Sequence, residues 1–101
     1  MARYDVFPNP GNATAPYLLD VQNDLLDGLA TRVVAPLGLP SAYRARFPDL
    51  NPCLVVGGEE FVLMTHLLAA VPIAELSRPV TSLAAEHDTV LRALDMLFQG
   101  F

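Results

Sequence analysis

Short apolar runs, separated by clusters of proline, glycine and asparagine, fill the first three quarters of the chain. Runs of four to eight residues that are rich in β-branched and aromatic side chains are typical of strands. The stretch at 8–16, "PNPGNATAP", predicts a loop, because proline lacks the ladder donor and glycine and asparagine favour turns. The glycine pair at 57–58 predicts a hairpin. Strands are expected between about residues 3 and 76, at 4–7, 17–21, 31–37, 53–56, 59–66 and 73–76, with an irregular connection at 41–50.

The hydrophobic period changes after Pro79. Apolar side chains then recur at helical spacing, which predicts one helix over about residues 83–99. Thr81 or Ser82 is its expected N-cap, and Asp88 and Arg92 are spaced to form an i,i+4 ion pair. The apolar stripe contains Leu83, Val90, Leu94 and Leu97, with Leu91 and Phe98 beside it.

These elements predict a mainly β fold with one C-terminal helix, in a single domain over residues 1–101. Five to seven short strands with frequent turns favour a small barrel or sandwich. Apolar types make up 52% of the residues and charged types only 17%, and the mean hydropathy is +0.37. Because large exposed apolar patches mark interfaces, this composition predicts an oligomer or a complex.

The charge of the chain argues against direct contact with nucleic acid. Its net charge is −5 and its isoelectric point lies near 4.6, whereas proteins that follow phosphates carry clustered lysine and arginine. The first residues lack the basic and apolar segments of a signal peptide, and prolines interrupt every apolar run before it is long enough to span a bilayer. We therefore expect a cytoplasmic protein without membrane contact.

The sequence predicts no catalytic, metal or cofactor site. Cys53 is expected to be a small core residue of its strand, and His66 and His87 to be packed or solvated. The aspartates around the turn after 17–21 favour hydrogen bonds to their own backbone over metal binding; they are Asp20, Asp24 and Asp27. We therefore expect a protein that is not an enzyme.

The C-terminus is both apolar and anionic. Phe98 and Phe101 place large rings where chain ends are typically small and polar. The last helical turn carries Asp95 and no lysine or arginine, although the helix dipole favours a cation there. Gly100 suits the positive φ that would turn the last residue away from the barrel. Leu97 is expected to pack the helix end onto the barrel.

Four stretches together resemble the CcdB toxins of bacterial toxin–antitoxin systems. The resemblance spans nearly the whole chain, and the combination of Asp-Val-Gln-x-Asp with Arg-x-Val-x-Pro-Leu is fairly specific. It implies an SH3-like β-barrel with a long C-terminal helix, assembled as a homodimer. The four stretches are "YLLDVQNDLLDG" at 17–28, "TRVVAPL" at 31–37, "VPI" at 71–73 and "LFQGF" at 97–101.

The resemblance also implies a function. CcdB toxins bind the A subunit of DNA gyrase through the C-terminal helix ends of their dimer and trap the enzyme with its DNA cleaved. A CcdA-type antitoxin neutralises the toxin, and the pair represses its own operon, so that the toxin reaches DNA only through the antitoxin. Two alternatives stay open: a homologue that binds the antitoxin without acting on gyrase, and a MazF-like endoribonuclease built on the same barrel. Only six lysines and arginines are available to line an RNA groove.

Carried over residue by residue, the resemblance assigns the gyrase contact to two segments. Leu25 and Leu26 are adjacent in a polar turn, so at most one of them is expected to face inward. The best-known members of the family carry Trp where this chain has Gln99 and Ile where it has Phe101, which implies that the aromatic group has moved to the terminus. The implied contact residues are Leu25, Leu26, Arg92, Asp95, Phe98, Gln99, Gly100 and Phe101.

Overall fold

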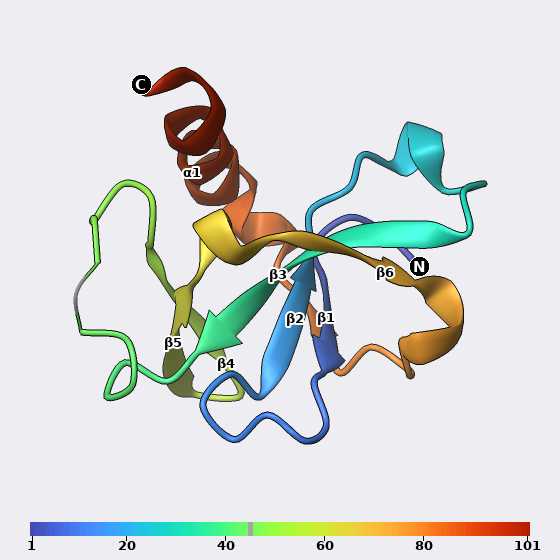
Figure 1. Ribbon diagram of the computed structural model, residues 1–101, viewed down its shortest axis with the longest axis horizontal. Helices are drawn as coiled ribbons and strands as arrows, with labels where there is room; N and C mark the ends of the chain where they lie inside the picture. Colours follow the sequence, from blue (N-terminus) through green and yellow to red (C-terminus); the bar gives the residue numbers. More distant parts are fainter. Residues whose placement is uncertain (45) are drawn as a thin grey trace.

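The computed structural model describes residues 1–44 and 46–101, which form a nearly closed, barrel-like antiparallel sheet with a helix at one end (Figure 1). The predicted mainly β, SH3-like barrel with one C-terminal helix is confirmed. The strands follow the order β4-β5-β3-β2-β1-β7, and β6 pairs with β3 as well. They are β1 (Asp5–Pro8), β2 (Tyr17–Asp20), β3 (Thr31–Gly38), β4 (Cys53–Val56), β5 (Glu59–Leu63), β6 (Ala69–Pro72) and β7 (Thr81–Ser82).

The central strand of the barrel is β3, which is eight residues long. Its first half pairs with β6 and its last two residues with β5, while β2 lies along its other edge. Leu19 of β2 faces Ala35 of β3, and both side chains are fully buried. Because strand side chains alternate between faces, this register fixes which residues of both strands enter the core.

The hairpin of β4 and β5 forms where the glycine pair predicts it. Gly57 and Gly58 have φ angles of 60° and 82°, the left-handed values that a tight hairpin turn requires. However, β5 ends at Leu63, and a 3₁₀ turn, η2 (Thr65–Leu67), replaces the predicted continuation to residue 66. The expected irregular connection at 41–50 contains no helix or strand at 41–44 and 46–50, and residue 45 lies outside the described residues.

The prediction that Cys53 is a core residue is wrong, because its thiol-bearing side chain is exposed. In β4 burial alternates, so that Leu54 and Val56 enter the core while Cys53 and Val55 face outward. The strand is the last in the sheet order, and its outer face has no covering layer in the described residues. Which face of an apolar strand is covered depends on the rest of the fold.

The prediction of a short strand at 73–76 is also wrong. A 3₁₀ turn, η3 (Ile73–Glu75), occupies that segment, and the strand is β6, four residues earlier in the chain. Its partner β3 determines the location, because Thr31 faces Pro72 at the start of the ladder and Val34 faces Ala69 at its end.

The helix α1 (His87–Gln99) begins later than the sequence predicts, because a 3₁₀ turn, η4 (Ala84–Glu86), precedes it. The two expected cap residues instead form β7, which pairs with β1. The hydroxyl of Ser82 accepts a hydrogen bond of 3.2 Å from the backbone N–H of Ala84, the first residue of η4, but the N-cap of η4 is Leu83 and that of α1 is Glu86.

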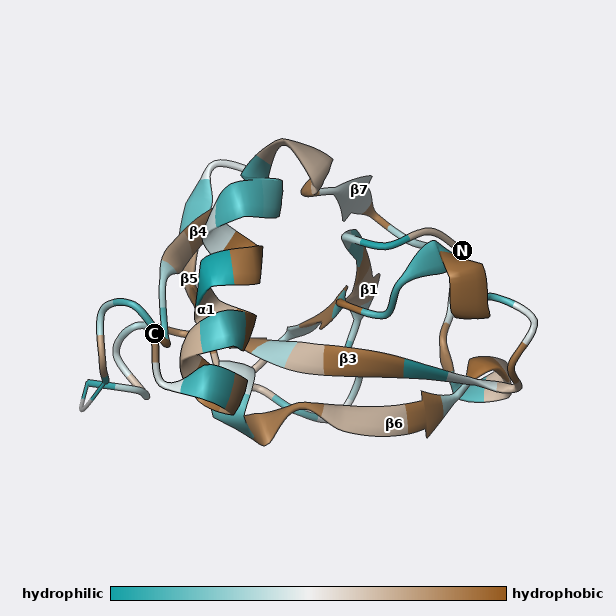
Figure 2. Cartoon of the chain, turned by 90° about the horizontal axis from the view of Figure 1, so that it is seen from above, coloured by the Kyte–Doolittle hydropathy of each residue, from teal (hydrophilic) through white to brown (hydrophobic). Residues whose placement is uncertain are grey.

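Two apolar stripes run along α1, and Figure 2 shows the helix lying against one end of the barrel. The first stripe packs onto the barrel and consists of Val90 and Ala93, which are buried, and Leu97, which is half-buried. The second stripe has i, i+3, i+7 spacing and stays half-buried or exposed; it consists of Leu91, Leu94 and Phe98. The helix therefore presents apolar side chains to solvent as well as to the core.

Candidate functional site

The C-terminal end of α1 is shaped by Gly100, which adopts the left-handed conformation with φ 81° and ψ 9°. Its N–H donates a hydrogen bond of 3.1 Å to the carbonyl of Met96, which would otherwise lack a helical partner. A Cβ at this position would contact nothing within 4 Å, so conformation and not space makes glycine suitable here. The chain reverses at this point and leaves Phe101 80% exposed.

The tip, defined as residues 98–101, is apolar and carries no cation. Phe98 is 70% exposed, and the last turn of α1 contains no basic residue. Gln99 is also exposed, and its amide donates a hydrogen bond of 3.4 Å to the carboxylate of Asp95. A partner that covers these rings would therefore gain the free energy of burying them.

Arg92 lies one to two turns before the tip and is exposed. The ion pair predicted between Asp88 and Arg92 is wrong, because the ion pairs among the described residues both involve Arg32. On an exposed helix face such a pair stabilises little, so its absence has a small energetic effect. It leaves the guanidinium of Arg92 available at the surface.

The second predicted segment is a 3₁₀ turn, η1 (Asp24–Leu26). Asn23 caps it, because its side-chain oxygen accepts a hydrogen bond of 2.8 Å from the N–H of Leu25. Leu25 is 91% exposed and Leu26 50% exposed. This agrees with the expectation that at most one of the two faces inward, since the turn buries neither.

A groove of about 410 Å³ brings the turn and the helix together, because Leu26 lines one side of it and Phe98 the other. Figure 1 shows α1, in red, and the turn after β2, in light blue, rising on the same side of the barrel. Of the predicted contact residues, only these two line the groove; Leu25 and the rest of the set do not. The other lining residues are Val21, Gln22, Asn23, Leu29, Thr31, Val33, Leu68 and Leu94.

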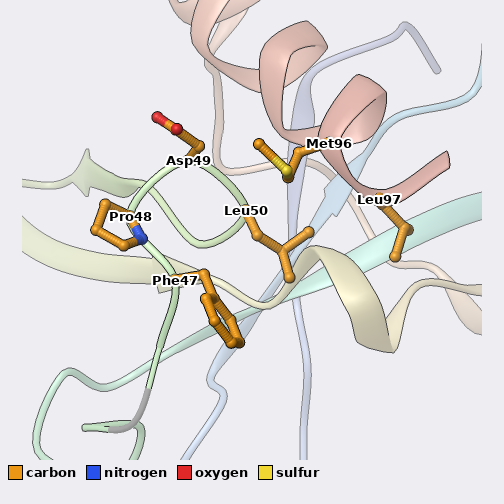
Figure 3. Close-up of a pocket in the computed structure, with 6 residues that line it drawn as sticks. All are labelled: Phe47, Pro48, Asp49, Leu50, Met96 and Leu97. Atoms are coloured by element: carbon orange, nitrogen blue, oxygen red, sulfur yellow. The ribbon is translucent and has the colours of Figure 1, made fainter. Parts of the chain in front are cut away.

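A second hollow of about 410 Å³ lies on the other flank of the helix end (Figure 3). Met96 and Leu97 line it from α1, and Phe47 and Leu50 line it from the connection before β4. Leu97 is half-buried there, as expected for a residue that packs the helix end. Phe47, in contrast, is 72% exposed.

A buried polar cluster supports the turn, and sequence reasoning missed it. The guanidinium Nε of Arg32, in β3, donates a hydrogen bond of 2.7 Å to the carboxylate of Asp20, at the end of β2. Both side chains are fully buried. Gln22, 6% exposed, completes the cluster. Two opposite charges inside neighbouring apolar strands were the available signal, because buried charges are almost always paired.

Two opposing effects act on this ion pair. Burial raises the pKa of the Asp20 carboxyl, while the hydrogen bond from Arg32 acts to lower it. The same hydrogen bond raises the pKa of Arg32. The distance of 2.7 Å between Arg32 Nε and Asp20 Oδ2 is typical of a charge-assisted hydrogen bond, which indicates that both groups are ionised.

The histidines and the cysteine do not come together. His87 shares a hydrogen bond with the hydroxyl of Tyr4, and Nδ1 of His66 lies 3.3 Å from the amide nitrogen of Asn51. Within residues 1–44 and 46–101, no group of three or more histidine, cysteine, aspartate or glutamate side chains is placed to hold a metal ion. In the same residues no helix is long and apolar enough to cross a membrane.

The barrel with a single C-terminal helix, whose tip and neighbouring turn expose apolar side chains, has the features implied by the sequence resemblance. A model of the CcdB protein family matches residues 3–100, and the chain therefore belongs to the CcdB family. The proteins of this family are the toxins of toxin–antitoxin systems.

Proposed function

We propose that this chain poisons DNA gyrase by inserting the tip of α1, together with the Leu25–Leu26 turn, into a binding site on the gyrase A subunit. The bound toxin traps gyrase with its DNA cleaved, in the cytoplasm. The observation that supports this proposal most strongly is the tip itself, where Phe98 and Phe101 are 70% and 80% exposed at the end of a well-formed helix.

The energetics of the tip favour a binding role over a folding role. Burying one phenylalanine side chain contributes about 1.5–3 kcal/mol, and the fold realises little of this for either ring. Leu25 adds a third apolar group that the fold leaves uncovered. A protein partner that encloses these side chains would gain most of that free energy.

We further propose that the active species is a homodimer. Its support is the exposed apolar side chains of Leu91 on α1 and Leu67 on η2, two elements that are in contact; Phe98 stays outside this interface and free for gyrase. Apolar surface of this extent is typical of an interface in a small protein. Two tips then belong to one particle, which doubles the apolar surface offered to the two A subunits of gyrase.

A CcdA-type antitoxin is the second proposed partner, and with it the toxin represses its own operon. The net charge of −5 and the exposed apolar side chains suit a disordered, partly basic tail that folds on binding. Titration with such an antitoxin should show binding that weakens as salt is raised, because charge attraction is screened. An affinity that does not change with salt would contradict the electrostatic part of this proposal.

The direct test is a supercoiling assay with purified gyrase, relaxed plasmid and ATP. We expect the protein to inhibit supercoiling and, after detergent and protease treatment, to leave linear DNA. The replacement of the family's Trp by Gln99 favours one competing function, in which the protein binds antitoxin but has no effect on gyrase. Antitoxin binding together with unimpaired supercoiling would establish that alternative.

A further inference from the structure

The Leu25–Leu26 turn has little apolar packing to hold it. Its 3₁₀ segment contains no buried residue, and the Leu25 side chain is almost fully exposed. Turns of this kind are mobile unless hydrogen bonds fix their backbone. The question is therefore which groups keep this turn in one conformation.

Gln22 supplies two of those hydrogen bonds from a buried position. Its side-chain nitrogen donates to the carbonyl of Leu26 at 3.0 Å, and its side-chain oxygen accepts from the N–H of Val33 at 3.0 Å. One amide therefore ties the last residue of the turn to strand β3. The same side chain lines the groove between the turn and Phe98.

The Asp20–Arg32 pair fixes the backbone of Gln22 through hydrogen bonds to its N–H and its carbonyl. The other carboxylate oxygen of Asp20 accepts from the backbone N–H of Gln22 at 3.0 Å. Arg32 Nη2 donates to the Gln22 carbonyl at 3.4 Å and lies 3.6 Å from the carboxylate of Asp24, the first residue of the turn. Asp24 also accepts from the N–H of Arg3 at 2.7 Å, so the turn is held at both ends.

Stability alone does not account for this cluster. Apolar residues of similar volume can often replace a buried ion pair without loss of stability, while buried polar groups can specify one conformation. Arg32 Nη1 is buried and has no hydrogen-bond partner in the described residues, so the cluster is not fully satisfied. A turn that is already ordered before binding avoids the entropic cost of ordering it on the target.

We propose that Gln22, supported by Asp20 and Arg32, is a positioning residue that holds the Leu25–Leu26 turn in the conformation that contacts gyrase. This inference rests on the proposed function, and it adds a residue that the resemblance does not assign to the contact. Gln22 acts through the carbonyl of Leu26 and does not itself need to touch the target.

The main test variant is Gln22→Met, which keeps the side-chain length and removes both hydrogen bonds. Asn9→Leu is the matched control, because the Asn9 amide ties a loop in the same way, donating to the carbonyl of Ala15 at 2.8 Å. That loop, between β1 and β2, lies at the opposite end of the barrel from α1 (Figure 1). Gln22→Glu is a second variant that keeps an acceptor for the N–H of Val33, replaces the donor to Leu26 with an oxygen, and adds a carboxylate at this buried position.

Three quantities are measured for each protein: the melting temperature, amide hydrogen exchange over residues 23–29, and affinity for a purified gyrase A fragment. We expect Gln22→Met and Gln22→Glu to exchange faster in this turn and to bind gyrase about tenfold more weakly, a loss of about 1.4 kcal/mol. Asn9→Leu should keep wild-type affinity at a comparable melting temperature. Leu25→Ala should weaken binding without changing exchange.

Unchanged exchange in the turn, or unchanged affinity in both Gln22 variants, would overturn the positioning role. An equal loss of affinity in Asn9→Leu would also overturn it, because the effect would then be one of general stability. If the wild-type protein does not bind the gyrase fragment at all, the proposed function fails. Hydrogen exchange then decides alone whether Gln22 orders the turn.

Discussion

Leu26 and Phe98 come from opposite ends of the chain and line the same groove. The turn that carries Leu26 is fixed through Gln22 to β3, and the helix that carries Phe98 is fixed through Val90 and Ala93 to the barrel. The fold therefore holds the two predicted contact segments on one side of the molecule. This relationship allows one partner to contact both segments at once.

Replacing Gln99 with Trp should strengthen gyrase binding. Gln99 is exposed and its one side-chain hydrogen bond, to Asp95, is long at 3.4 Å, so an indole can replace it without disturbing the core. An indole that meets a cation gains about 0.5–2 kcal/mol, which corresponds to about a twofold to thirtyfold tighter complex. Titration of the gyrase A fragment measures this change, and Gln99→Leu controls for added apolar area. Equal affinity of Gln99→Trp and wild type would show that Phe101 already fills that place.

The protein should sediment as a homodimer at micromolar concentration, with about twice the monomer mass of 10.9 kDa. The physical reason is the apolar surface that the fold leaves exposed at Leu91 of α1, 38% exposed, and at Leu67 of η2, 48% exposed. Leu91→Glu would place a charge in the interface that Leu91 and Leu67 are proposed to form, and should shift the sedimentation towards monomer. Glu75→Gln, on the η3 turn, is the control. A wild-type monomer at this concentration would contradict the prediction.

Tyr4 should make the stability depend on alkaline pH. Burial raises the pKa of its hydroxyl above the ordinary value of about 10, and that hydroxyl is hydrogen-bonded to His87. Above about pH 10 the unfolded chain loses this proton more readily than the folded protein, so stability falls as the pH rises through that range. Tyr4→Phe has no hydroxyl to titrate, so it should lack this contribution to the fall in stability at high pH. Near pH 7 it should be about 0.5–1.5 kcal/mol less stable than the wild type, because it lacks the hydrogen bond.

Denaturant titrations of both proteins from pH 7 to pH 11 measure this difference. The stability gap between wild type and Tyr4→Phe should narrow as the pH rises. A gap that stays constant would mean that the folded state does not perturb the Tyr4 hydroxyl.

Much of the fold was predictable because it depends on local patterns. The glycine pair at 57–58 predicted the hairpin, and the helical spacing of apolar residues predicted the end of α1 and placed its start four residues too early. The errors concern features that only the assembled sheet determines. Cys53 lies in an apolar strand, but on the face that the rest of the fold leaves uncovered, and β3 determined where β6 lies.

The sequence and the resemblance name candidate contact residues, but they do not reveal the groups that support them. The helical pattern of apolar residues placed Phe98 beside the packing stripe, and the resemblance added Leu25, Leu26 and Phe101. The role of Gln22 was not predictable, because an amide gives no sign in the sequence of which backbone groups it will meet. Those groups, at Leu26 and Val33, come together only after β2 and β3 have paired.

The central claim is that the tip poisons gyrase, and the most direct measurement compares the wild-type protein with a variant that lacks Gly100 and Phe101. Purified gyrase, supercoiled plasmid and each protein are incubated with ATP, and the cleaved DNA is quantified beside thermal melts of both proteins. We predict abundant cleaved DNA with wild type, little or none with the truncated protein, and melting temperatures within a few degrees of each other, because Phe101 is 80% exposed. Equal cleavage by both proteins, or a truncated protein that melts many degrees lower, would contradict the account.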